Sequence, residues 1–231
     1  MRKTTRSLLT AGALAVAMSG SLLLAGPAIA DTGDVVNPLS SSDESQVRDY
    51  FDQYGVAPAV QDDLIWSFKT GDAWDAFQPG AEPVSTTVQT TDLTENTIKT
   101  YADGSIAVTE VEIPTAVNSN SRAWGCTFTS AGTYGGYWKN CDVTVNLGVI
   151  SQGFHLNYEN IQGGGAKITS YDRYHHFIVG GALGGHRLER ISNTKVRYSA
   201  DLSVAWQGFP LGWTSWMQAN LSGNDITTTH N

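Results

Sequence analysis

The second half of the chain alternates apolar and polar residues, which is typical of strands with one buried and one solvent-facing side. Valine and leucine occupy every second position in 143–149, and the stretches 154–158 and 196–206 repeat this two-residue period. Short glycine-rich segments separate these stretches and mark the connections between strands. The pattern predicts a mainly β fold, an antiparallel sandwich or an open barrel.

A helical period precedes these strands. Apolar residues recur at three- and four-residue spacing, which predicts one apolar stripe on each of two helices. A capping box of Ser41 and Glu44 is expected to start the first helix, and Gly55 to end it. Pro58 suits the first turn of the second helix, and Gly71 suits its C-terminal cap. The sequence therefore predicts a short N-terminal helical pair before the β region.

A proline- and glycine-rich break at 78–85 separates the two periods. We expect residues 31–83 to form an acidic linker and the helical pair, and 84–231 to form the antiparallel β domain. The β region should open with a hairpin over 94–113. Its apolar residues change face midway, which predicts a β-bulge near Thr109–Glu110.

The first thirty residues have the order of a secretory signal peptide: a short basic start, an apolar run and a small-residue cleavage site. Cleavage is expected after Ala30, so the protein should be secreted. No later stretch is apolar enough to form a transmembrane segment.

Acidic residues outnumber basic ones by 22 to 14, for a formal net charge of −8. Most of the acids precede residue 113, whereas all five histidines and both cysteines follow it. The chain has no dense basic stripe that could neutralise phosphates, so a nucleic-acid partner is disfavoured. The composition leaves the oligomeric state open.

Cys126 and Cys141 are the only cysteines. They lie fifteen positions apart across a glycine-rich turn, and an exported chain enters an oxidising space. The sequence therefore predicts one disulfide between them. A metal-binding or catalytic pair is the weaker alternative, because this spacing matches no zinc pattern.

The segment 206–216 holds three tryptophans and a phenylalanine. The alternation assigns Trp206 and Trp213 to the core. It leaves Phe209, Leu211 and Trp216 as candidates for an exposed apolar patch that binds a sugar ring or a partner protein. The alternative is that the helical pair or a neighbouring loop covers them.

Tyr137 and Trp138 lie in the turn that the disulfide is expected to close. Rigid, exposed aromatic side chains bind at low entropic cost, so both are candidate binding residues. Trp138 could equally pack over the disulfide, and the sequence does not choose between these two arrangements.

The densest polar cluster is YDRYHHF, 171–177. His175 and His176 are adjacent and should point to opposite faces of a strand, so a metal site would need His155, His186 or a carboxylate to approach one of them. We interpret these histidines as surface residues near a sheet edge. The sequence thus predicts no metal site, no cofactor and no assignable catalytic residue.

No hydrolase, zinc-protease or nucleotide-binding motif occurs in the sequence. Glycoside hydrolysis needs two facing carboxyl groups, and Glu159 and Asp172 flank one hairpin of the β region. They keep a small secreted hydrolase acting on glycans, with a carboxylate or histidine site, as an alternative function.

Two stretches, FDQYGVAPAVQDDLIWSFKTGDAWDAFQPGAEPVS and YADGSIAVTEVEIP, give the chain a resemblance to uncharacterised secreted proteins of Gram-positive actinobacteria. The resemblance covers roughly residues 50–114. It implies export and a two-part layout, and it carries no activity or site residue.

These observations favour a non-catalytic extracellular or cell-envelope protein that binds a glycan, a cell-wall polymer or a protein through exposed aromatics. An exported toxin or bacteriocin-like protein is a third hypothesis. The net negative charge disfavours action on membranes, because anionic surfaces repel such a protein.

Overall fold

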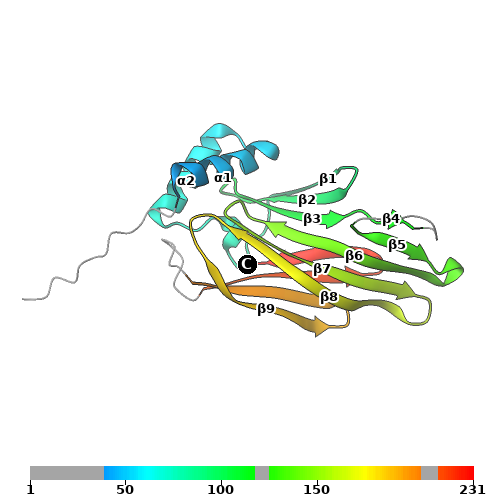
Figure 1. The fold of residues 1–231 in the computed structure, drawn as a ribbon. Helices are drawn as coiled ribbons and strands as arrows, with labels where there is room; N and C mark the ends of the chain where they lie inside the picture. The colour runs from blue at the N-terminus through cyan, green and yellow to red at the C-terminus, as the bar shows by residue number, and fades with distance from the viewer. Residues whose placement is uncertain (1–38, 118–124, 204–212) are drawn as a thin grey trace, which may run out of the picture. The chain divides into compact units, whose positions relative to one another are not determined.

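The computed structural model describes residues 39–117, 125–203 and 213–231, which form two antiparallel sheets preceded by two helices (Figure 1). The predicted mainly β fold with an N-terminal helical pair is confirmed. The predicted signal peptide, 1–30, and its cleavage site at Ala30 lie outside the described residues. The helices are α1 (Ser41–Gln53), α2 (Pro58–Thr70) and a short 3-10 helix, η1 (Asp75–Phe77).

The first sheet has the strand order β1-β2-β3-β6-β5-β4, with β7 beside β6 and β8 beside β7. A 3-10 helix, η2 (Gly132–Tyr134), leads into β6. The strand pairs are antiparallel apart from a two-residue parallel pairing of β4 with β5. The strands of this sheet are β1 (Ser85–Thr90), β2 (Thr94–Thr100), β3 (Ile106–Glu112), β4 (Thr115–Ala116), β5 (Thr127–Ser130), β6 (Gly135–Asn146), β7 (Ile150–Ile161) and β8 (Gly165–Ile178).

The second sheet follows in the chain and has the strand order β12-β11-β10-β9. Its strands pair antiparallel with their neighbours in the sequence. They are β9 (Leu183–Ser192), β10 (Lys195–Leu202), β11 (Thr214–Ser222) and β12 (Asp225–His230).

The capping box of α1 lies one residue before the predicted one. Ser40 is the N-cap: its Oγ accepts from the Asp43 backbone N–H at 3.2 Å, and the Asp43 carboxylate accepts from the Ser40 N–H at 2.9 Å. Glu44 is instead bound by Arg48 at 2.9 Å and by Lys69 of α2. The predicted start of α2 at Pro58 is confirmed, as is its left-handed cap at Gly71, with φ of 101°.

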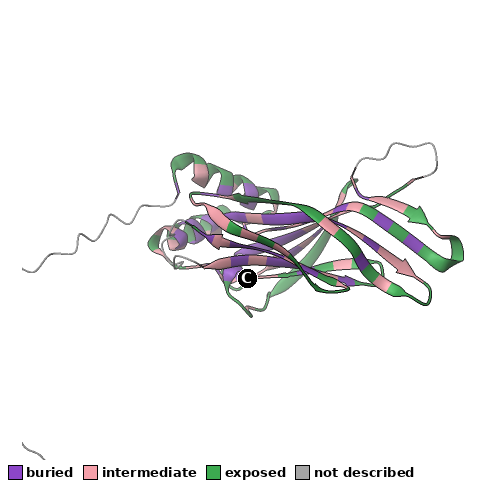
Figure 2. Ribbon diagram, turned by 60° about the horizontal axis from the view of Figure 1, so that its bottom comes forward, coloured by how far each residue is buried: buried purple, intermediate pink, exposed green. Residues whose placement is uncertain are grey.

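The helical pair packs on the first sheet and shares its core. Tyr50 of α1 is buried, and its hydroxyl donates to the Asn146 carbonyl oxygen of β6 at 2.9 Å. The Tyr54 hydroxyl donates to the Glu110 carboxylate of β3 at 3.0 Å. Burial colouring shows the same continuity, with buried residues on the helices and along the strands (Figure 2). Neither α-helix of the described chain has the length and apolar character needed to cross a bilayer.

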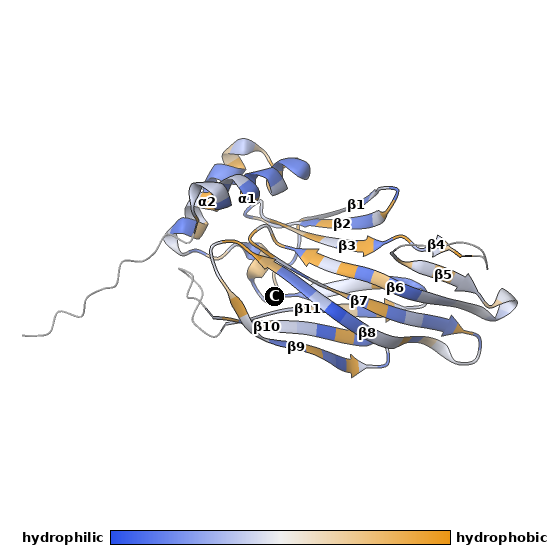
Figure 3. Cartoon of the chain, in the orientation of Figure 1, coloured by the Kyte–Doolittle hydropathy of each residue, from blue (hydrophilic) through white to orange (hydrophobic). Residues whose placement is uncertain are grey.

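The two sheets bury their facing sides against each other. Ser215 of β11 donates to the Gln152 side chain of β7 at 2.7 Å, so one polar pair crosses this interface in the core. Apolar and polar residues alternate visibly along β6 and β7, as predicted (Figure 3). The buried side chains between the sheets include Val143, Val145, Phe154, Leu156, Tyr198, Ala200, Met217 and Ala219.

The expected bulge near Thr109–Glu110 is wrong. The pairing of β2 with β3 runs without interruption from Thr94↔Glu112 to Thr100↔Ile106. The apolar pattern changes face because different layers cover the two sides of β3. Ile106 lies on the side that faces the helical pair, whereas the Thr109 hydroxyl hydrogen-bonds Thr228 of the second sheet at 2.5 Å.

Strand β6 changes partner along one edge. Residues 136–139 pair with β5 and residues 143–146 pair with β3, while the opposite edge pairs with β7. The change occurs at a bulge where Asn140 adopts φ of 59°. The predicted Cys126–Cys141 disulfide is confirmed, and it ties the chain before β5 to β6 at this point.

Candidate functional site

A cleft of about 570 Å³ lies between the two sheets, at the end where β12 faces β2 and β3. Its volume lies within the range of about 300–1,000 Å³ that is usual for small-ligand sites. Apolar residues form part of its wall, together with two aromatic residues. The apolar and aromatic lining residues are Val111, Ile113, Pro114, Trp138, Tyr158 and Ile226.

Hydroxyl and charged side chains form the rest of the cleft wall. Thr97, Thr109 and Thr228 bring hydroxyl-bearing side chains from both sheets, whereas the hydroxyl of the lining residue Thr227 donates to the Asn220 carbonyl oxygen at 3.5 Å. Glu95, Glu112, Asp225 and Lys99 are its charged lining residues, and the Glu112 carboxylate accepts from the Asp142 backbone N–H at 2.9 Å. The cleft therefore offers both donors and acceptors beside an apolar wall, and its own charge is negative.

Lys99 also acts on the neighbouring histidine of β12. Burial, reinforced by the positive charge of Lys99, lowers the pKa of His230 to about 4. His230 is therefore neutral at pH 7, so the ammonium of Lys99 carries the positive charge at this end of the cleft. The pKa of Tyr158 is raised, first by burial and then by the charge of Asp225, which keeps its hydroxyl protonated as a donor.

Trp138 lines the cleft but does not present an open ring face to it. The Phe128 ring lies 4.8 Å away on a tilted plane, and Tyr158 stacks at 4.8 Å with an interplanar angle of 4°. The side chain is 8% exposed. Trp138 is therefore held by Phe128 and Tyr158 where it lines the cleft, and its packing partners are these two rings.

Among the other predicted binding residues, Tyr137 and Trp216 are described, and neither belongs to the cleft lining. Tyr137 is 41% exposed. Trp216 is half-buried, and the Arg197 guanidinium lies 4.2 Å from its ring centroid, so a neighbouring cation covers one face. Phe209 and Leu211, like the predicted core residue Trp206, lie outside the described residues. Trp213 is half-buried and packs against the core near Phe77.

Glu159 and Asp172 do not face each other. Glu159 is bound by Lys167 at 2.9 Å, and Asp172 by Arg173 at 3.2 Å. Asp172 pairs across the strands with His155, four positions from Glu159 along β7, which corresponds to roughly 13 Å of strand. Neither carboxylate lines the cleft.

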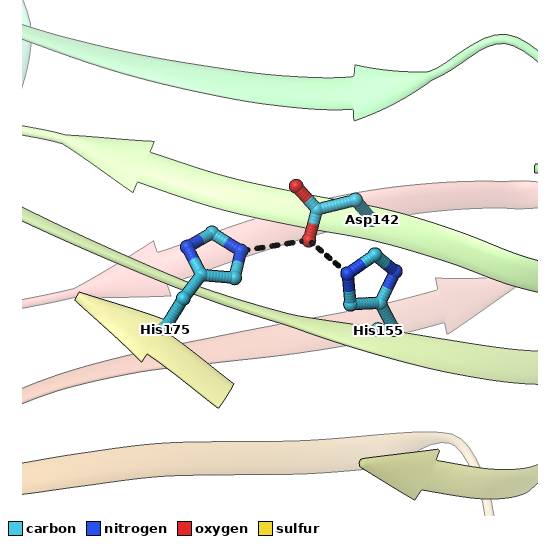
Figure 4. A group of neighbouring side chains, drawn as sticks. All are labelled: Asp142, His155 and His175. Carbon is cyan, nitrogen blue, oxygen red and sulfur yellow. Dashed lines mark hydrogen bonds and ion pairs between the residues drawn. The ribbon is translucent and has the colours of Figure 1, made fainter. Parts of the chain in front are cut away.

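His175 and His176 point to opposite faces, as the alternation predicts. Nδ1 of His176 lies 3.2 Å from the Tyr198 hydroxyl oxygen, and the His176 ring stacks on the His186 ring with their centroids 4.6 Å apart. His175 instead approaches Asp142 and His155 (Figure 4). The latter three residues, one each from β6, β7 and β8, could hold a metal ion.

Of the residues that line the cleft, sequence reasoning singled out Trp138, and it identified neither the other lining residues nor Asp142 as site residues. Asp142 is one of several acids in the β region, and only the pairing of β6, β7 and β8 brings it to the histidines. Lys99 and Thr228 meet because two sheets face each other, which alternation along one strand does not encode. Comparison of the chain with protein-family models, curated proteins and solved structures returns no match.

Proposed function

We propose that this chain is an exported, non-catalytic binding protein that holds a neutral, hydroxyl-rich ligand of the glycan class in the cleft between its sheets. The observation that carries the proposal is the composition of the cleft wall: threonine hydroxyls and carboxylates beside an apolar surface. Sugars have the same two sides, because hydroxyl groups flank apolar C–H faces. Carboxylates accept strong hydrogen bonds from such hydroxyls.

Export is supported by the signal-peptide pattern and by the disulfide, because a Cys126–Cys141 bridge persists in oxidising compartments. The rigidity of the site also favours binding. Trp138 is held by two neighbouring rings, and Thr109 is held by its hydrogen bond to Thr228. Ligand binding therefore costs little side-chain conformational entropy at these residues.

The proposal places the ligand in the cleft and not on the exposed aromatic residues. The test is a calorimetric titration of the purified chain with neutral oligosaccharides based on glucose, mannose and N-acetylglucosamine. Glu95→Gln removes one charged acceptor, and Ile226→Trp fills the cleft. Each should weaken binding about tenfold, since a lost hydrogen bond to a charged group or a steric block costs on the order of 1.4 kcal/mol or more.

Two matched variants act as controls. Glu189→Gln makes the same chemical change on the exposed face of β9, and Tyr137→Ala removes an exposed ring outside the cleft lining. Both should bind as the wild type does. If Tyr137→Ala abolishes binding while the cleft variants retain it, or if no oligosaccharide in the panel binds, the proposal is wrong.

A further inference from the structure

Asp142, His155 and His175 lie on three neighbouring strands and turn their side chains toward one point (Figure 4). Asp142 of β6 is directly opposite His155 of β7, and His175 of β8 is opposite Gly153, two positions earlier in β7. One ligand atom from each residue can be chosen so that all lie within 4.8 Å of one another. This cluster is distinct from the cleft, whose lining contains none of the three.

The distances are those of a metal site that needs only small adjustments. Nε2 of His175 lies 2.9 Å from Oδ1 of Asp142, and Nε2 of His155 lies 3.9 Å from the same oxygen. A tetrahedral ion with bonds of about 2.0–2.1 Å separates its ligand atoms by about 3.3 Å. The two observed spacings lie on either side of that value, within reach of modest side-chain rotations.

The backbone has two features that bring His175 to this position. Gly153 leaves room for the ring, because a Cβ there would lie 2.4 Å from Cε1 of His175 and 2.6 Å from its Nε2. In β8 one extra residue lies between Asp172 and His175, and Arg173 there adopts φ of 48°. Regular alternation from Asp172 would place His176 on this face, so the bulge determines that His175 occupies it.

The surroundings hold the carboxylate and leave one imidazole incompletely satisfied. Thr144 donates to Oδ2 of Asp142 at 3.2 Å, which fixes the carboxylate through the oxygen that does not face the histidines. Nδ1 of His155 is buried and has no hydrogen-bond partner among the described residues. Its Nε2 is too far from Asp142 for a hydrogen bond. The His155 ring is thus held at the site without a close polar contact to explain its position.

We propose that Asp142, His155 and His175 bind a zinc-class divalent cation through one carboxylate oxygen and two imidazole nitrogens. Two imidazoles and a carboxylate suit zinc and its neighbours among the transition metals, whereas calcium requires six to eight oxygen ligands. The side chain of His175 is 44% exposed, so a fourth coordination position faces solvent. The site therefore has the three-ligand, one-open-position form in which a water molecule or an anionic ligand completes the shell.

The test is a calorimetric titration of the metal-free purified chain with Zn²⁺, and separately with Ca²⁺. Zn²⁺ should bind with one ion per chain, and Ca²⁺ at the same concentration should not. His155→Gln and His175→Gln should each weaken Zn²⁺ binding by at least about tenfold. Mutation of residues that only hydrogen-bond to metal ligands already weakens metal binding by about that much. Gly153→Ala keeps all three ligands but displaces the His175 ring, so it should weaken binding as well.

His176→Gln is the matched control, because it changes the adjacent histidine on the opposite face of β8 and should leave Zn²⁺ affinity unchanged within twofold. Histidine-ring NMR of the wild type gives a readout that does not depend on folding of the variants: Zn²⁺ should shift the signals of His155 and His175 before those of the other three. Absence of Zn²⁺ binding, or binding that His176→Gln removes and His155→Gln does not, would overturn the proposal.

Discussion

The two faces of strands β6, β7 and β8 differ in what determines their residues. On the inner face, Val143, Phe154 and Leu156 are fully buried or nearly so between the two sheets. On the outer face, Asp142 and His155 lie one position away from these residues and remain partly exposed. The inner residues stabilise the fold by burying apolar surface, whereas the outer residues contact one another only through polar groups. Substitutions on the outer face should therefore change the free energy of unfolding little.

The largest expected effect tests this contrast at adjacent positions of β7. Phe154→Ala should lower the free energy of unfolding by about 3–5 kcal/mol, because it removes a large, fully buried ring and leaves a cavity. His155→Ala should cost less than about 1 kcal/mol in metal-free buffer, because the side chain is only partly buried and has no close polar contact. Urea unfolding of both variants measures the difference. Equal costs would show that the outer face is also part of the stabilising core.

The next effect concerns the disulfide, which joins the inner set at Cys141. Replacing both cysteines by serine should destabilise the chain by about 3 kcal/mol, because the unfolded chain regains the freedom of a fifteen-residue loop. Thermal unfolding with and without a reducing agent checks this. The reductant should lower the midpoint of the wild type and leave that of the double variant unchanged. A wild type insensitive to complete reduction would contradict the prediction.

His230 of β12 and His175 of β8 should affect the pH dependence of stability in opposite directions. The pKa of His230 is lowered to about 4, first by burial and then by Lys99. In the unfolded chain His230 is protonated below about pH 6.5, whereas in the folded chain it stays neutral down to about pH 4. The free energy of unfolding therefore decreases as pH falls from about 6.5 to about 4. The loss should be roughly 2–3 kcal/mol. Urea unfolding of the wild type and His230→Gln across this range should show a steeper acid loss in the wild type.

His175 provides the opposite case and the smallest effect. Its hydrogen bond to Asp142 raises its pKa, although burial acts against this. The pair's contribution is therefore complete below about pH 6.5, provided that Asp142 is ionised, and it disappears as pH rises through the raised pKa. In a chelator, His175→Gln should differ from the wild type by less than about 1 kcal/mol at pH 5.5 and by still less at pH 8.5. A difference that grows with pH would contradict this.

Burial raises the pKa of Asp142, but the hydrogen bond from His175 and the charges of both imidazoles outweigh it and hold the pKa below its usual range. The carboxylate therefore stays ionised through the pH range of the His175 comparison. Any change in that comparison reports on the imidazole alone.

Much of the fold could be predicted because local signals and burial act in the same direction. Pro58 and Gly71 have backbone preferences that fit the two ends of α2, and both were identified from the sequence. The capping box of α1 was misplaced by one residue, because several serines and acids there compete for the same role and Ser40 with Asp43 forms the pair.

The candidate sites were harder to predict because they depend on register between strands. The apparent phase change near Thr109 reflects two different covering layers, which the sequence of β3 alone does not distinguish from a bulge. Two of the bulges that the structure does contain lie at Asn140 and Arg173, where residues other than glycine adopt positive φ. Because the bulge at Arg173 selects His175 over His176, alternation without it identifies the wrong histidine for the outer face.

The change of partner along β6 has a consequence for local opening of the chain. A backbone amide of β6 exchanges its hydrogen with deuterium from solvent only when a neighbouring strand separates, and this strand has neighbours along both edges. Among the described strands, β1 has β2 as its single neighbour, and all residues of β1 are exposed. Deuterium uptake should therefore be fast in β1 and slowest in β6, which makes β6 the last part of the first sheet to open.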